Sequence, residues 1–245
     1  MNSLMPIPKK IHQIWWQGEE KIPEKFKKWQ HSWKKFHPTW EYKLWSNENM
    51  HEFVYLHEPE IFGYYSKWPL DASRGDAFRY IVLKHLGGVY VDMDIECLKP
   101  IDYWVDNSRL LLSKTYTFNN AIFGGCSEHP LFIELCKGLN VKMDKGVKEF
   151  FEKSGPLYFA GTISRLNITQ SENCKVAPHW AFEPFTPYIS DSGQIVVGND
   201  TSNSYAIHHE TLQWQSWTDR LISRISQKLV MPIFRFWINL INKLH

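Results

Sequence analysis

Two aspartates separated by one residue, Asp92 and Asp94, are the strongest candidates for chemistry in this 245-residue sequence. Side chains of a β-strand alternate between its two sides, so both carboxylates point the same way wherever the strand stays regular. Carboxylates held that close repel each other unless a positive charge lies beside them. A hard divalent cation, Mn²⁺ or Mg²⁺, meets that need and completes its coordination shell with water and substrate phosphates.

The position of this pair strengthens the metal interpretation, because a D-x-D triplet alone occurs often by chance. Asp92 follows the apolar run Val89–Val91, which in turn follows the glycine pair Gly87 and Gly88. In open α/β sheets, ligands bind beyond the carboxyl ends of the strands. We therefore predict a site at this end of the strand. Glu96 is not predicted as a ligand, since the strand is expected to end there.

Asp76 and Arg79 lie three residues apart, on one face of the helix expected over residues 77–86. A helical ion pair of this kind contributes about 0.3 to 0.5 kcal/mol and needs no ligand. The same two groups could instead bind sugar hydroxyls or phosphate oxygens. Both interpretations remain open at the level of the residues.

Strands and helices alternate around these candidates, which predicts an α/β fold with a mostly parallel sheet flanked by helices. The first half carries the clearer pattern, with strands expected over 11–16, 41–45 and 89–95, helices over 22–36 and 77–86, and a helix cap at Asn47. The second half predicts strands over 110–113, 121–123, 195–197 and 205–207, and a helix over 130–139. No G-x-G-x-x-G follows the first strand, so the dinucleotide-binding fingerprint is absent.

The composition fits one large domain, which we place at residues 1–219. The net charge of +2 gives no general attraction to nucleic acid, so none is expected as a partner. The four cysteines lack C-x-x-C spacing and predict neither a zinc site nor a redox motif. Aromatic residues reach 16%, which indicates either a heavily aromatic core or a site that stacks flat rings. The N-terminus has no apolar segment typical of a secretory signal peptide.

Residues 220–245 differ from the rest, because they contain no acidic residue and carry apolar side chains three or four positions apart. This pattern predicts a basic amphipathic helix that lies on a membrane surface. Pro232 is expected to kink it or to start a second helix. Packing against the domain or a partner subunit is the alternative.

The motifs described above, taken together, resemble the DXD-containing sugar-binding region of glycosyltransferase family 32. That family includes fungal initiating mannosyltransferases and bacterial capsular and surface polysaccharide enzymes, and the large glucosylating toxins share the spacing. The residues that carry the resemblance are Asp76, Arg79, Gly87, Gly88, Tyr90, Asp92 and Asp94, with the strand-like segments 7–15 and 38–45 before them. The family usually has Ser before the first aspartate, whereas Gly75 stands here.

The resemblance implies a GT-A fold for nucleotide-diphospho-sugar transfer with retention of anomeric configuration. It assigns Asp94 to the metal, Asp92 to the metal and the ribose, and Asp76 and Arg79 to the sugar. It assigns Trp15 to stacking on the nucleobase. Further residues expected to contact the nucleotide-sugar are Ile14, Tyr80, Asn119, Asn120 and Trp217. Further expected metal ligands are His208, His209 and Ser216.

The sequence is therefore expected to encode a metal-dependent hexosyltransferase that uses a nucleotide-sugar, with a UDP-sugar favoured, and a glycan or lipid-linked glycan acceptor. The lack of a signal-peptide-like segment at the N-terminus and the basic tail predict a location on the inner face of a bacterial cell membrane. The expected role is in surface polysaccharide (capsule) biosynthesis. A toxin-like effector that glycosylates protein and a non-catalytic sugar-binding module are the alternatives. Nucleotidyltransferases and phosphatases also use paired aspartates, but they would need a phosphate-binding glycine loop or further downstream acids.

Overall fold

The computed structural model describes residues 5–211 except 116, 145–146, 171–172, 187, 190–194, 197 and 199. The predicted tail over 220–245, Ser216 and Trp217 therefore lie outside the described residues. None of the helices in the described part of the chain combines the length and the apolarity that crossing a bilayer requires.

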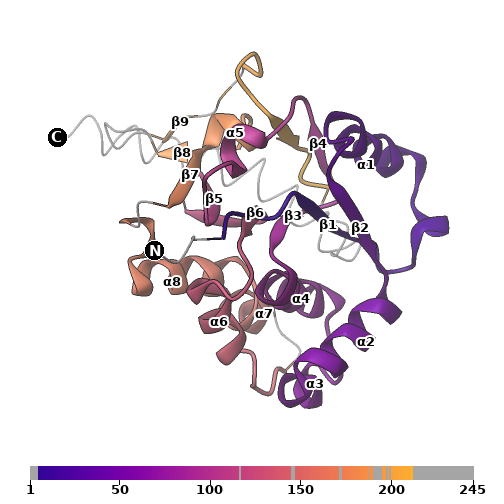
Figure 1. The fold of residues 1–245 in the computed structure, drawn as a ribbon. Helices are drawn as coiled ribbons and strands as arrows, with labels where there is room; N and C mark the ends of the chain where they lie inside the picture. The colour runs from indigo at the N-terminus through magenta and orange to yellow at the C-terminus, as the bar shows by residue number, and fades with distance from the viewer. Residues whose placement is uncertain are drawn as a thin grey trace.

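A six-stranded sheet forms the centre of the molecule, with the strand order β2-β1-β3-β6-β5-β7 (Figure 1). The strands are β1 (Lys10–Ile14), β2 (Glu41–Trp45), β3 (Gly88–Val91), β5 (Leu110–Lys114), β6 (Phe118–Gly125) and β7 (Cys174–Pro178). Within this sheet β6 alone runs antiparallel to its neighbours β3 and β5, and the other pairs are parallel. The expectation of a mostly parallel sheet is confirmed.

Two short pairs complete the described strands. β4 (Ile95–Cys97) pairs antiparallel with β10 (Ala206–His208), and β8 (Tyr188–Ile189) pairs with β9 (Ile195–Val196). The described helices are α1 (Glu24–Phe36), α2 (Asn47–His57), α3 (Pro59–Tyr65), α4 (Asp71–Leu86), α5 (Asp102–Val105), α6 (Pro130–Lys137), α7 (Val147–Lys153), α8 (Pro156–Leu166), α9 (His179–Phe182) and the 3-10 turns Glu19–Lys21 and Ile168–Gln170.

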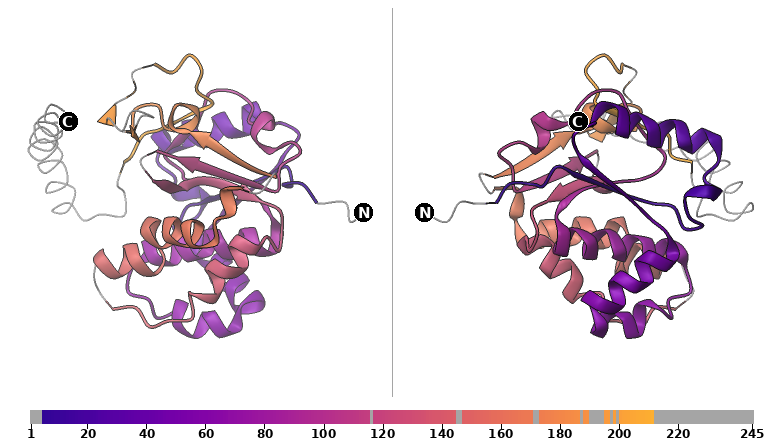
Figure 2. Two further views of the ribbon diagram at one scale, coloured as in Figure 1. Left: turned by 90° about the vertical axis from the view of Figure 1, so that its left-hand side faces the viewer. Right: turned by 45° about the vertical axis from the view of Figure 1, so that its right-hand side comes forward.

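Helices cover both faces of the sheet, so the protein has three layers (Figures 1 and 2). Side chains alternate along β5 and so contribute to two separate hydrophobic cores, because Leu110 and Leu112 face one side of the sheet and Leu111 faces the other. The core beneath the sheet packs against α2, α3, α4, α6 and α8. Large rings such as Trp33, Trp45 and Trp68 are fully buried, so most of the aromatic content is structural.

Two details of the early elements differ from the expectation. The cap of α2 is Ser46, whose hydroxyl accepts from the Asn49 amide, and Asn47 is instead the first helical residue. α4 begins at Asp71, six residues before the predicted start, so that it contains Asp76. It ends at Gly87 as predicted, and the positive φ of 61° there is a conformation that glycine adopts without strain.

The strand expected over 89–95 is divided, which changes the local account of the two aspartates. β3 ends at Val91, and a turn follows in which the Ile95 amide donates to the Asp92 carbonyl at 3.1 Å. Asp92 and Asp94 therefore do not share one side of a regular strand. The turn, rather than the strand alternation, brings their carboxylates to the same site.

Candidate active site

A pocket of about 570 Å³ opens where β1 and β3 end and β6 begins. Its walls come from β1, α4, the Asp92–Asp94 turn, β6, the α7–α8 corner and the chain after β10. Among the lining residues are Ile14, Trp15, Gly75, Asp76, Arg79, Asp92, Asp94, Asn119, Asn120, Phe151, His208, Glu210 and Thr211. A position beyond the carboxyl ends of two parallel strands is where α/β sheets bind ligands.

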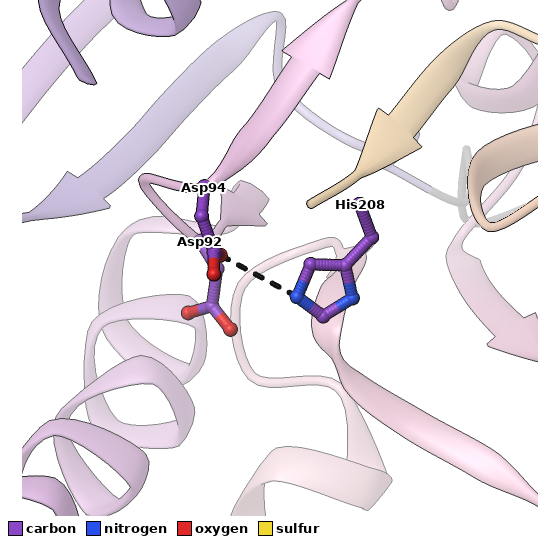
Figure 3. Close-up of side chains that lie close together, drawn as sticks. All are labelled: Asp92, Asp94 and His208. Atoms are coloured by element: carbon purple, nitrogen blue, oxygen red, sulfur yellow. Dashed lines mark ion pairs between the residues drawn. The ribbon is translucent and has the colours of Figure 1, made fainter. Parts of the chain in front are cut away.

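Asp94 is held by the segment after β10. The Thr211 amide and hydroxyl donate to its Oδ2 at 2.8 and 2.9 Å, and the His209 amide donates to its carbonyl at 2.9 Å. Its Oδ1 lies 3.4 Å from Nε2 of His208 (Figure 3). Burial by itself raises the pKa of Asp94, but His208 and Thr211 outweigh burial and hold the pKa well below its usual range.

His208 reaches this position because β10 pairs with β4, which places His208 opposite Ile95, next to the aspartate turn. Burial would lower the pKa of His208, but the carboxylates of Asp94 and Glu183 face its two ring nitrogens and raise it well above the usual value. One ligand atom from each of Asp92, Asp94 and His208 lies within 4.8 Å of the others. Two carboxylates and an imidazole are a donor set that fits Mn²⁺ or Mg²⁺.

The Arg79 side chain lies between Asp76 and Asp92 and contacts both. Its guanidinium lies 2.8 Å from Asp76, 3.3 Å from Asp92 and 4.4 Å above the Tyr90 ring, and it donates to the Asn120 carbonyl at 2.6 Å. Burial raises the pKa of Asp92, although Arg79 opposes the effect. The interpretation of Asp76 and Arg79 as an ion pair is therefore correct, but the pair lies in the pocket wall and is buried.

One carboxylate oxygen of Asp76, a residue that lines the pocket, has no hydrogen-bond partner in the described part of the chain. Its Oδ1 accepts from the Asn120 amide at 3.1 Å, while Oδ2, like Nε of Arg79, is buried and has no hydrogen-bond partner among the described residues. Burial raises the pKa of Asp76 to about 7, against the opposing charge of Arg79. Gly155 lies beside the free oxygen, since a Cβ at that glycine would stand 3.3 Å from it. A buried polar atom without a partner is costly, and a substrate hydroxyl could satisfy it.

Ile14 is the last residue of β1 and Trp15 follows it, and both line the same pocket. The Trp15 ring packs on Phe26 at 4.9 Å between centroids, and its Nε1 is buried with no hydrogen-bond partner in the part of the chain that the structure describes. Tyr80 does not line the pocket. It is fully buried behind it, where its hydroxyl accepts from Asn120 and donates to the Ser154 carbonyl.

The side chains of the two adjacent asparagines contact different partners, and so do those of the two adjacent histidines. Asn120 faces Asp76, whereas the Asn119 amide donates to Glu183 at 2.9 Å. His208 faces Asp94, but the ring of His209 stacks on Trp29 at 4.2 Å and contacts Glu96 at 3.0 Å, outside the pocket lining. Of the pair, His208 therefore lines the pocket and His209 does not.

Sequence reasoning missed three residues at this site. Glu210 and Thr211 line the pocket directly after the histidine pair, and Glu183 lies buried behind His208. Glu183 had one signal in the sequence, since it is a lone acid within the apolar run 181–185. Neither Glu210 nor Thr211 had such a signal, because their role depends on the pairing of β10 with β4.

Comparison with known proteins identifies the family. Residues 23–111 match the family model described as "Glycosyltransferase sugar-binding region containing DXD motif". An uncharacterized glycosyltransferase of Acanthamoeba polyphaga mimivirus is 31% identical over 69% of this chain and 77% of that protein. The chain belongs to this DXD glycosyltransferase family.

A fungal relative extends beyond the shared region. Inositol phosphoceramide mannosyltransferase 1 of Schizosaccharomyces pombe is 28% identical over 70% of this chain and 56% of that protein. The chain thus spans about half the length of that mannosyltransferase. Mannosyltransferases of Saccharomyces cerevisiae and Candida albicans also match. Because these relatives are fungal or viral, the expected location on the inner face of a bacterial membrane is wrong.

Solved structures support the fold of this DXD glycosyltransferase. The PaToxG glycosyltransferase superposes with a TM-score of 0.56 at 20% identity, over 67% of this chain and 71% of that chain. The ligand-free glycosyltransferase domain from the YGT toxin gives 0.53 at 8% identity, over 70% and 80%. The fold is of the GT-A type, as expected. At these identities, the likeness concerns the fold alone.

Proposed function

We propose that this glycosyltransferase moves a hexosyl group from a nucleotide-sugar to a hydroxyl of a glycan or glycolipid, with help from Mn²⁺ or Mg²⁺. The observation that supports it most is the convergence of Asp92, Asp94 and His208 in the pocket that Asp76 and Arg79 line. The names of the fungal relatives favour mannose as the sugar and an inositol phosphoceramide type of acceptor. These choices replace the earlier preference for a UDP-sugar and a capsular glycan.

Asp92, Asp94 and His208 would hold the metal ion in this proposal, with Glu210 nearby in the same pocket. When bound, the ion supplies positive charge that stabilises the departing diphosphate. The family resemblance also assigns His209 and Ser216 to the metal, but the His209 ring contacts Trp29 and Glu96. Ser216 and Trp217 lie outside the described residues and stay predictions from the resemblance.

The sugar would lie against α4 in this scheme. The free Oδ2 of Asp76 accepts from a sugar hydroxyl, and Arg79 donates to an oxygen of the nucleotide-sugar through the unpartnered Nε. Trp15, which reaches the pocket from the end of β1, offers a flat ring for the nucleobase. Tyr80 acts from behind the wall, through its hydrogen bond with Asn120.

We propose that anomeric configuration is retained by attack of the acceptor on the face that the diphosphate leaves. The acceptor hydroxyl then gives its proton to the departing phosphate oxygen, while positive charge develops at the anomeric carbon. This route needs no carboxylate nucleophile. A covalent glycosyl adduct on a pocket carboxylate, trapped and found by mass spectrometry, would exclude it.

The deciding experiment measures hydrolysis and transfer with a panel of GDP- and UDP-sugars in the presence of Mn²⁺. We expect turnover of one sugar, lost with a chelator and reduced about 100-fold or more in kcat/KM by Asp94→Asn. Glu96→Gln is the matched control, because Glu96 is two residues away, carries the same charge and does not line the pocket. Absence of turnover for every sugar, together with unchanged sugar binding when Asp92 and Asp94 are both replaced by Asn, would favour a sugar-binding module.

A further inference from the structure

Glu183 is a buried carboxylate that neither the motifs nor the proposed function uses. It follows α9, and its side chain has no exposed surface. Within the described part of the chain, no lysine or arginine forms an ion pair with it. Burying a carboxylate without a cationic partner is expensive, so its hydrogen bonds must compensate.

The hydrogen bonds of Glu183 join three strands behind the pocket. Its Oε1 accepts from Ser113 of β5 at 3.2 Å, and its Oε2 accepts from Asn119 of β6 at 2.9 Å. The same Oε2 lies 3.5 Å from Nδ1 of His208 on β10 and 3.5 Å from the Thr186 hydroxyl. Each of these residues is therefore fixed to the others through one carboxylate.

The imidazole of His208 stands between two carboxylates. Nδ1 faces Glu183, and Nε2 faces Asp94 at 3.4 Å on the pocket side. When Nδ1 carries its proton toward Glu183, the lone pair of a neutral ring is on Nε2, directed into the pocket beside Asp92 and Asp94 (Figure 3). A carboxylate behind a ligating histidine commonly fixes the tautomer and orientation of the ring in this way.

From this arrangement we infer that Glu183 is a positioning residue, which orients His208 for a divalent cation. The inference rests on the proposed function. Glu183 is not itself a ligand, because its side chain is shielded from solvent, does not line the pocket and has hydrogen-bond donors on both oxygens. Glu210, whose carboxylate lies near the same imidazole, lines the pocket and is exposed by comparison.

The test is a titration of the full-length protein with Mn²⁺ alone, and again with GDP or UDP, in which free Mn²⁺ is followed by electron paramagnetic resonance. Glu183→Gln keeps the shape and removes the charge, and we expect Mn²⁺ to bind about 10- to 100-fold more weakly. Glu58→Gln is the matched control. It removes another largely buried carboxylate, which pairs with Lys84 and His85 in the last turn of α4, and should leave Mn²⁺ affinity within about twofold.

Mn²⁺ affinity in Glu183→Gln that stays within about twofold of the wild type would overturn the inference and leave the proposed function intact. Absence of Mn²⁺ binding by the wild type, with or without nucleotide, would instead overturn the metal role and this inference with it. If Glu183→Gln does not fold, Ser113→Ala decides, since it removes one hydrogen bond that holds Glu183. We expect about fivefold weaker Mn²⁺ binding in that variant, and an unchanged affinity would contradict us.

Discussion

At the scale of single residues, neighbours with the same chemistry have different surroundings. His208 lies between two carboxylates, whereas His209 stacks on an indole and reaches a surface acid. Asp94 is held by hydrogen bonds that favour its charge, whereas burial dominates at Asp76. The surroundings of each side chain therefore decide its role, and the residue type alone does not.

The histidine pair gives a direct comparison of these surroundings. We expect His208→Ala to lower kcat/KM with Mn²⁺ by more than about 10-fold, because it removes an imidazole that faces Asp94. His209→Ala should have a smaller effect, since the His209 amide that binds Asp94 is unchanged. Steady-state kinetics over a range of Mn²⁺ concentrations measures both. Equal losses in the two variants would contradict the separation of their roles.

Asp76 should make the stability of the protein depend on pH. Burial raises its pKa to about 7 in the folded state, whereas the pKa of an aspartate in the unfolded chain is about 4. Between these values the folded chain binds more protons than the unfolded chain, so this contribution to the free energy of unfolding falls as pH rises. Relative to Asp76→Asn, the wild type should lose about 2 to 3 kcal/mol between pH about 5 and about 7.5.

Urea unfolding of the two proteins at several pH values checks this. The sign is specific, since a carboxylate with a lowered pKa would give the opposite slope. Parallel stability curves for the wild type and Asp76→Asn would show that Asp76 ionises normally in the folded state.

At the scale of elements, the junction between α4 and β3 sets the site. α4, which precedes the junction, carries Asp76 and Arg79, and the turn after β3 carries Asp92 and Asp94; all four residues line the pocket. Gly87 and Gly88 connect them with φ angles of 61° and 104°. A Cβ at Gly88 would stand 2.7 Å from the Lys10 carbonyl of β1, so the parallel pairing of β1 and β3 requires the bare backbone.

Gly88→Ala should therefore destabilise the protein by about 2 kcal/mol or more, through backbone strain and contact with β1. Gly75→Ala is the matched control within α4, where a Cβ meets nothing within 4 Å. That change should raise the free energy of unfolding by about 0.5 to 1 kcal/mol, because alanine favours the helix. Urea unfolding at one pH measures both, and equal effects would refute the steric argument.

At the scale of the whole molecule, three layers hold the pocket walls in place while the site itself is open. The two cores on opposite faces of the sheet are built from alternate side chains of the same strands. The pocket lies at the edge where three of these strands meet. Residues 220–245 stay a separate prediction, with 1–219 as the catalytic domain and a membrane surface as the partner of the tail.

Removing residues 220–245 tests that division. We expect the shortened protein to keep hydrolysis of its nucleotide-sugar and to lose cosedimentation with vesicles that contain anionic lipid, because the basic and aromatic side chains are gone. Vesicles of neutral lipid are the control for the electrostatic part. Vesicle binding that survives the truncation would place the membrane contact elsewhere, and lost hydrolysis would show that the tail belongs to the domain.

The sequence alone determined the local features of this protein. Glycine pairs, apolar periodicity and the spacing of Asp76, Arg79, Asp92 and Asp94 depend on neighbours within one turn or one strand, so the elements and the family could be predicted from them. The tertiary structure decided which distant residues complete the site. His208 meets Asp94 because β10 pairs with β4 more than a hundred residues away, and Glu183 joins them from a buried turn. Such pairings depend on long-range packing, which no local pattern encodes.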